Sequence, residues 1–118
     1  MAKKKRFLTS VRAAWAGLIH AFRSEKNMKI HGVCAILVIL FAAWFHVSRS
    51  DWVILLLLIF LVFAFELMNT AVERTVDLCT QYDHPLARQA KDVAAGAVLV
   101  VAVASAIIGV IIFSRYLF

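Results

Sequence analysis

The fold of this chain is decided by residues 52–77, which read WVILLLLIFLVFAFELMNTAVERTVD. Residues 52–65 carry no charge, and polar residues then follow at helical spacing: Glu66, Asn69, Glu73 and Asp77. At about 100° per residue these lie at roughly 0°, −60°, −20° and +20° around a helix, so they share one narrow stripe. An acid at the edge of a bilayer costs about 3 kcal/mol to insert, so this stripe indicates a functional site.

Composition places the whole chain in a membrane. The 118 residues are 64% hydrophobic, and a soluble domain of this length has too little interior to cover so much apolar surface. A single proline, few glycines and no alternating strand pattern favour helices over a barrel. We therefore predict one all-α, integral membrane domain over residues 1–118. Cys34 and Cys79 form no ligand-spaced pair and are predicted to be ordinary reduced thiols.

The net charge of +6 is concentrated near the N-terminus. A basic cluster can indicate nucleic acid, but in so hydrophobic a chain it indicates an anionic lipid surface and a cytoplasmic face. Nucleic acid is therefore not expected as a partner. Eight of the thirteen basic residues lie within the first 29 positions: Lys3, Lys4, Lys5, Arg6, Arg12, Arg23, Lys26 and Lys29.

Helical periodicity and uncharged stretches predict four segments. Residues 7–24 have apolar positions at helical spacing with a basic flank, which predicts an amphipathic helix on the membrane surface. Uncharged stretches predict transmembrane helices over residues 32–47, 52–72 and 93–113. The first of these is short, and it needs flanking residues such as Ile30 or a thin membrane to cross.

Capping residues predict where the helices begin. Ser50 or Asp51 is expected to cap the second span, and the polar stripe predicts that this helix continues beyond the membrane edge. Pro85 suits the first turn of the next helix, with Asp83 or His84 as its cap. That helix is predicted to run directly into the third span.

Basic residues near the span ends predict the orientation. The N-terminal segment carries eight and the loop over residues 74–91 carries three, whereas Arg49 and Arg115 stand alone after the first and third spans. The positive-inside rule therefore predicts a cytoplasmic N-terminus, a cytoplasmic second loop and a C-terminus outside.

The acidic stripe suits proton transfer at its deep end and metal binding at its outer end. Glu66 is the deepest acid, where loss of water favours use as a general base or proton carrier. Glu73 and Asp77 lie further out and offer oxygens to a hard cation such as magnesium, with Glu25 as another candidate ligand. Lys91 is placed to neutralise phosphate oxygens.

Other roles stay open for the same residues. The outer acids could pair with Arg74, Arg88 or Lys91 as a solvated ionic cluster, and Asn69 could form a hydrogen bond between helices. The chain has no glycine-rich phosphate loop and no protein-kinase signature. A proton- or cation-conducting protein and a non-catalytic membrane adaptor therefore remain alternatives to an enzyme. Scattered histidines are predicted to be interfacial: His20, His31 and His46.

The stripe and the residues after it resemble the bacterial diacylglycerol kinase family of small three-span lipid kinases. The resemblance is carried by FELMNTAVERTVD at 65–77 and AKD at 90–92, and it extends to WAGL at 15–18 and to Glu25. Two further segments resemble the Gram-positive branch, whose members act as undecaprenol kinases: EKNMKIH at 25–31 and HPLARQAKDVAAGAV at 84–98. The resemblance implies a homotrimer in the bacterial cell membrane, with active sites shared between neighbouring subunits.

The resemblance also implies a reaction and roles for individual residues. The reaction is transfer of the γ-phosphate of magnesium–ATP to undecaprenol, with diacylglycerol as the alternative acceptor. By position, Glu66 corresponds to the base, Glu25 and Glu73 to the metal ligands, and Asn69 and Asp77 to supporting residues. Ala13 stands where some relatives have a tyrosine facing the nucleotide, so that contact is absent or supplied differently. The implied nucleotide contacts are Arg6, Glu25, Glu73, Tyr82, Asp83, His84, Lys91 and Asp92.

Overall fold

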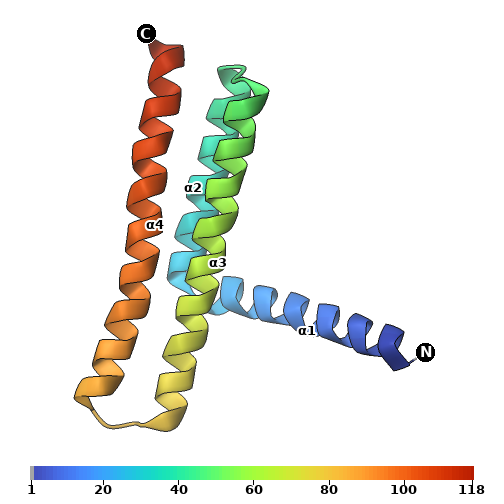
Figure 1. Cartoon of the computed structure of the whole chain (residues 1–118), viewed down its shortest axis with the longest axis vertical. Coiled ribbons are helices and arrows are strands. Elements are labelled where there is room, and N and C mark those ends of the chain that lie inside the picture. Colours follow the sequence, from blue (N-terminus) through green and yellow to red (C-terminus); the bar gives the residue numbers. More distant parts are fainter. Residues whose placement is uncertain (1) are drawn as a thin grey trace.

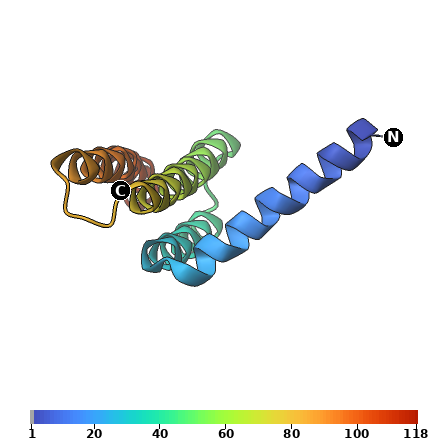
Figure 2. The same cartoon turned by 90° about the horizontal axis from the view of Figure 1, so that it is seen from below.

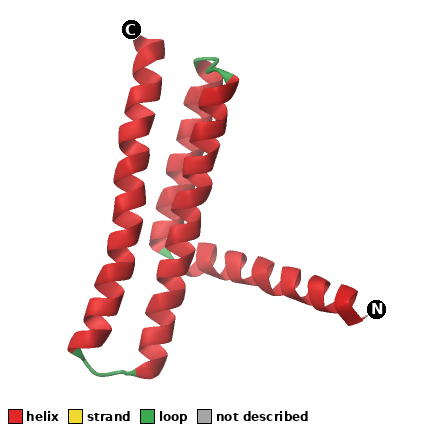
Figure 3. Cartoon of the chain, in the orientation of Figure 1, coloured by secondary structure: helices red, strands yellow, loops and turns green. Residues whose placement is uncertain are grey.

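The computed structural model describes residues 2–118 and contains only helices in that range, which confirms the predicted all-α fold (Figure 3). Three of the helices, α2, α3 and α4, are long and apolar enough to cross a membrane, as predicted. The four helices are α1 (Ala2–Ser24), α2 (Lys26–Trp44), α3 (Arg49–Cys79) and α4 (Pro85–Leu117).

The three apolar helices run side by side, whereas α1 projects sideways from the bundle (Figure 1). In the view from below, α3 lies between α2 and α4 (Figure 2). α3 packs against both neighbours, most extensively against α4, and it also contacts α1. The polar stripe therefore lies on the helix that packs most extensively against the rest of the bundle.

The interior of the bundle is thin, and most large apolar side chains face outward. This distribution suits a membrane, where lipid chains solvate apolar side chains as well as a protein core does. The largest buried group lies at the end of the bundle remote from the α3–α4 loop. It consists of Ala42, Val47, Leu55 and Ile112.

The helix α2 occupies a different range from the predicted span over residues 32–47. It begins at Lys26 and ends at Trp44, and its 19 residues are about 28 Å long, which is enough to cross a hydrocarbon core. The turn that follows explains the end of the helix. His46 has a left-handed backbone with φ 52°, and the Val47 N–H donates to the Ala42 carbonyl at 3.2 Å.

Side chains cap α3 and α4. The expected cap at Ser50 or Asp51 is wrong, because Ser48 caps α3 and its Oγ accepts from the Asp51 N–H at 3.2 Å. The spacing is that of a capping box, serine followed three residues later by an acid. His84, one of the two expected caps of α4, is confirmed, and its Nδ1 accepts from the Leu86 N–H at 3.1 Å. α3 also runs through Asp77, as the polar stripe predicted, and ends at Cys79.

A polar cluster joins the α2–α3 turn to the end of α4, and we call it the Asp51 clasp. The Asp51 carboxylate is buried and accepts from Arg115 Nη2 at 2.5 Å and from the Tyr116 hydroxyl at 2.6 Å. The Tyr116 hydroxyl in turn accepts from the Ser48 N–H at 2.8 Å. The clasp fixes the C-terminal end of α4 against the start of α3.

Candidate active site

The acidic stripe of α3 is divided between two polar clusters. At 1.5 Å per residue, Glu66 and Asp77 are about 16 Å apart along the helix axis. Glu66 lies in the upper cluster, where α3 meets α1 and α2, and we call this the junction cluster. Asp77 lies beside the α3–α4 loop, in a hollow that we call the loop pocket. The junction cluster consists of His20, Ser24, Glu25, His31, Glu66, Asn69, Thr70 and Arg74.

Glu66 is a buried acid. Only 2% of the residue is exposed, and its Oε2 lies 3.5 Å from Nε2 of His31 on α2. The Thr70 hydroxyl donates to the backbone carbonyl of Glu66 at 3.0 Å, and Thr70 is also buried. The packing of α2 on α3 therefore supplies a basic partner that the sequence of α3 lacks.

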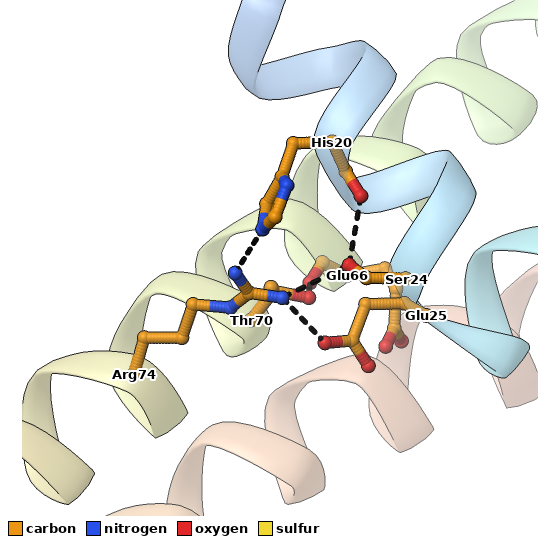
Figure 4. Close-up of polar contacts among 6 residues, drawn as sticks. All are labelled: His20, Ser24, Glu25, Glu66, Thr70 and Arg74. Carbon is orange, nitrogen blue, oxygen red and sulfur yellow. Dashed lines mark hydrogen bonds and ion pairs between the residues drawn. The ribbon is translucent and has the colours of Figure 1, made fainter.

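Arg74 ties α3 to the corner between α1 and α2. Its Nη2 donates to Glu25 Oε1 at 3.1 Å and to Ser24 Oγ at 2.9 Å, and its Nη1 contacts Nε2 of His20. Figure 4 shows the guanidinium group lying among these three side chains. This arrangement brings Glu25 onto the same side of α3 as Glu66 and sets the angle at which α1 leaves the bundle.

Asn69 is a buried member of the junction cluster, with 8% of the residue exposed. Its Oδ1 has no hydrogen-bond partner among residues 2–118, so this oxygen does not form the hydrogen bond between helices that the sequence left open. A buried amide oxygen without a partner is costly, and in native proteins such a group calls for an explanation such as a catalytic role or an ordered water or ion.

The loop pocket has a volume of about 530 Å³ and lies between the end of α3 and the start of α4. Lys91 Nζ lies 2.5 Å from Asp77 Oδ1, and Arg88 pairs with Asp83. Five of the eleven predicted site residues come together here, and the pocket combines cations with hydrogen-bonding groups, as phosphate binding requires. It is lined by Val76, Asp77, Thr80, Gln81, Tyr82, Asp83, His84, Ala87, Arg88 and Lys91.

Three predicted site residues lie outside both clusters, as does Ala13, which stands where some relatives have a tyrosine. Glu73 is half-buried on the stripe between them, and its charge acts on the Lys91 ammonium group. Asp92 is exposed and does not line the loop pocket. Arg6 and Ala13 are exposed on α1, which projects away from the bundle (Figure 1).

The carboxylates fit magnesium that is shared with phosphate oxygens. Among residues 2–118, no three histidine, cysteine, aspartate or glutamate side chains are grouped so that they could hold a metal ion by themselves. Magnesium in phosphate-transfer sites is usually held by one or two carboxylates together with the substrate phosphates. Glu25 and Glu73 are the two carboxylates predicted for this role, and Glu25 Oε1 is bound to Arg74.

His31 is the functional candidate that the sequence reading passed over. A signal for it was present, since Met28, His31, Ala35, Val38 and Ala42 recur at alternating steps of three and four residues. This spacing predicts one packed face on a helix, and all five positions are buried or half-buried. His20 and Arg74 were not predicted as partners either, because their contact joins elements 54 residues apart in the chain.

Comparison with known proteins gives evidence that is independent of this geometry. The family model described as prokaryotic diacylglycerol kinase matches residues 12–113. The chain belongs to this family. The alternatives of an ion-conducting protein and a membrane adaptor are therefore set aside, and the chain is a membrane lipid kinase.

Three relatives show the range within the family. An undecaprenol kinase of Bacillus subtilis is 46% identical over 108 residues, which is 92% of this chain and 88% of the relative. A diacylglycerol kinase of Synechocystis is 45% identical over 103 residues, and these cover 86% of this chain but only 59% of that longer relative. A diacylglycerol kinase of Escherichia coli is 30% identical over 102 residues, covering 86% of this chain and 84% of the relative.

Proposed function

We propose that this protein transfers the γ-phosphate of ATP to undecaprenol and so produces undecaprenyl phosphate. One observation carries the proposal: the buried acid Glu66 lies on the same stripe of α3 as the Asp77–Lys91 ion pair of the loop pocket. Glu66 can accept a proton at the lipid edge, and the ammonium group of Lys91 can neutralise phosphate charge. Together they supply what transfer of a phosphoryl group to an alcohol needs.

The loop pocket binds the nucleotide, and the junction cluster supplies the base. In the loop pocket, Lys91 and Arg88 hold the phosphates of ATP, and the loop residues Tyr82, Asp83 and His84 contact the nucleotide. Glu66 takes the proton of the lipid hydroxyl while the alcohol oxygen bonds to the γ-phosphorus and the bond to ADP breaks. Magnesium, held by Glu25 and Glu73 together with phosphate oxygens, would supply further charge neutralisation.

The acceptor chain has a suitable place beside Glu66. An apolar groove of about 340 Å³ lies between α2, α3 and α4, and His31 lines it together with Ile30, Cys34 and Phe63. A long polyprenyl chain in this groove would leave its hydroxyl end next to the His31–Glu66 pair. Undecaprenol is preferred over diacylglycerol because the Bacillus subtilis undecaprenol kinase matches nearly the whole of both chains.

The same proposal includes the placement of the protein. The basic helix α1 lies on the cytoplasmic surface, the N-terminus is cytoplasmic and the C-terminus is outside. A membrane-impermeant thiol reagent should then label Cys79 only from the cytoplasmic side.

Three copies assemble into a homotrimer in which the loop pocket of one subunit serves Glu66 of its neighbour. The distance of about 16 Å between Glu66 and Asp77 within one chain supports this shared arrangement.

The test is a transfer assay with the purified protein in detergent or vesicles. Labelled ATP and magnesium are offered with undecaprenol, with diacylglycerol, and with a fatty alcohol as a further acceptor. We expect undecaprenol to be phosphorylated with the highest kcat/KM. Faster phosphorylation of diacylglycerol would reassign the acceptor, and transfer to none of the lipids would refute the proposal.

A substitution of the proposed base provides the matched control. Glu66→Gln keeps the size of the side chain but cannot accept the proton, so we expect transfer to fall by about 10²–10⁴-fold. The protein should still bind ATP and assemble as the wild type does, as measured by nucleotide titration and by mass in detergent. Near-normal transfer by Glu66→Gln would show that another group is the base.

A further inference from the structure

The surroundings of Glu66 require a positive or hydrogen-bonding partner if the acid is to act as a base. A carboxylate with 2% exposure has lost most of its hydration, and a buried charge is stable only where a charged or hydrogen-bonding partner lies beside it. A neutral carboxyl group cannot take a proton from the lipid hydroxyl. Within the part of the chain that the structure describes, the one ion pair of Glu66 is with His31, at 3.5 Å.

The other charged groups near the junction cluster are already engaged. Arg74 of α3 is bound to Glu25, at the start of α2, and to His20 of α1. On the side of α4, Lys91 is paired with Asp77, about 16 Å further along α3. Among the described basic groups of the four helices, this leaves His31 as the partner of the Glu66 carboxylate.

The position of His31 suits this task. It belongs to the packed face of α2, only 20% of its side chain is exposed, and it also lines the apolar groove of about 340 Å³. Its imidazole therefore stands between the groove and the carboxylate. Histidine can carry a positive charge near neutral pH, so it can serve there as the cationic partner of a carboxylate.

We propose that His31 is a positioning residue that keeps the Glu66 carboxylate ionised and oriented until the lipid hydroxyl arrives. The inference rests on the proposed role of Glu66 as the base. His31 keeps the same protonation state throughout the transfer. The proton passes from the lipid hydroxyl to Glu66, ADP leaves with the electron pair of the broken bond, and Glu66 later releases the proton to water.

The pH dependence of kcat/KM for the lipid tests this role. His31→Gln removes the positive charge but keeps a hydrogen-bond donor, so the acid limb of the profile should move to higher pH by about one pH unit, a loss of about tenfold on that limb. At alkaline pH, activity should return to within about threefold of the wild type, because the variant keeps Glu66 and a hydrogen-bond donor beside it. His31→Lys restores a cation and should return the acid limb towards that of the wild type.

A chemical probe reads the same property without relying on turnover. Dicyclohexylcarbodiimide is an apolar reagent that modifies neutral carboxyl groups, so it should label His31→Gln faster than the wild type at neutral pH. The Glu66→Gln variant gives the background from other acids. Thermal unfolding midpoints of each variant, measured in the same detergent, show which are folded.

These measurements separate the inference from the proposed function. An acid limb that stays in place in His31→Gln, with activity lowered equally at every pH, would overturn the inference and leave Glu66 as the base. Equal labelling of the wild type and His31→Gln would overturn it as well. If the wild type phosphorylates no lipid, the proposed function fails, and the labelling still decides whether His31 controls the charge of Glu66.

Discussion

Asn69 shows what a single residue can contribute to both stability and function. Its buried amide oxygen has no partner among residues 2–118, and it lies one turn from the proposed base. A group of this kind weakens the isolated chain, since its lost hydration is not replaced. We therefore interpret the Asn69 oxygen as placed to accept a hydrogen bond from the lipid hydroxyl or from a donor of a neighbouring subunit.

Asn69→Leu separates these two contributions. Leucine has a similar size and removes the unpaired oxygen, so the free energy of unfolding should stay unchanged or rise by up to about 1 kcal/mol. Phosphoryl transfer should fall by at least about tenfold, because the polar contact made during the reaction is lost. Thermal unfolding in detergent and the lipid transfer assay measure the two effects.

A control for this substitution is Ser114→Ala at the far end of α4, where the hydroxyl donates only to the carbonyl of its own helix at Ile111. It should change neither quantity appreciably. If Asn69→Leu lowers stability and transfer together, Asn69 is a structural residue and its oxygen has a partner in the working assembly.

The sequence predicted which residues of the stripe belong to the site, but it did not predict their partners on other helices. Glu66 and Asp77 stand out in the sequence because they follow a long uncharged run and share one stripe at helical spacing. His31 meets Glu66 only when α2 packs on α3, and the contact of His20 with Arg74 depends on the corner between α1 and α2. Contacts between helices depend on how the helices pack, which a single-helix pattern does not specify.

At the scale of the helices, the Asp51 clasp holds the bundle at the end opposite to the loop pocket. Asp51 carries a buried carboxylate whose oxygens are both used, whereas 61% of the Arg115 side chain is exposed. Exposed ion pairs contribute little, but a buried hydroxyl or carboxylate left without its partner is costly. The central interaction of the clasp is therefore the one between Asp51 and Tyr116.

This difference predicts an order of stability. Asp51→Ala should lower the thermal unfolding midpoint most, because it removes the acceptor for both Arg115 and Tyr116. Tyr116→Phe should lower it less, and Arg115→Ala least. Activity per folded molecule at low temperature should stay near that of the wild type in all three variants. An Arg115→Ala variant as unstable as Asp51→Ala would show that the ion pair is the stronger contact.

The helix boundaries show where sequence signals were sufficient. Pro85 and the polar residues before it marked the start of α4, because proline suits the first turn and His84 can cap it. The end of α2 had no such signal, since His46, and not glycine, takes the left-handed conformation. The Ser48 cap was readable from its spacing to Asp51, but the buried role of that acid depends on α4.

For the whole molecule, the separation of the two clusters leads to a prediction about assembly. If Glu66 of one subunit works with the loop pocket of its neighbour, two inactive variants can complement each other. Glu66→Gln and Lys91→Met each disable one half of a shared site. In randomly mixed trimers about one site in four receives both intact halves, so mixing should restore up to about a quarter of wild-type transfer.

The mixing experiment uses co-expression of the two variants or reassembly from detergent, with each variant alone as the control. Mixed samples that stay as inactive as the separate variants would show that each chain completes its own site, with Lys91 and Glu66 of the same α3–α4 pair acting together. A monomeric mass in mild detergent would exclude the shared site directly.

The corner between α1 and α2 also has a mechanical consequence. Arg74 fastens α1 to α3 at a level about 12 Å from Glu66 along the helix axis. If α1 lies among the lipid head groups, the contacts of Arg74 fix the depth of Glu66 relative to α1. The base then lies at a set distance below the membrane surface. The hydroxyl of the acceptor lies at a depth fixed by its own head group. Bilayer thickness and surface charge would then change the rate of transfer. Either one changes the depth of α1 and so moves Glu66 away from the depth of the lipid hydroxyl.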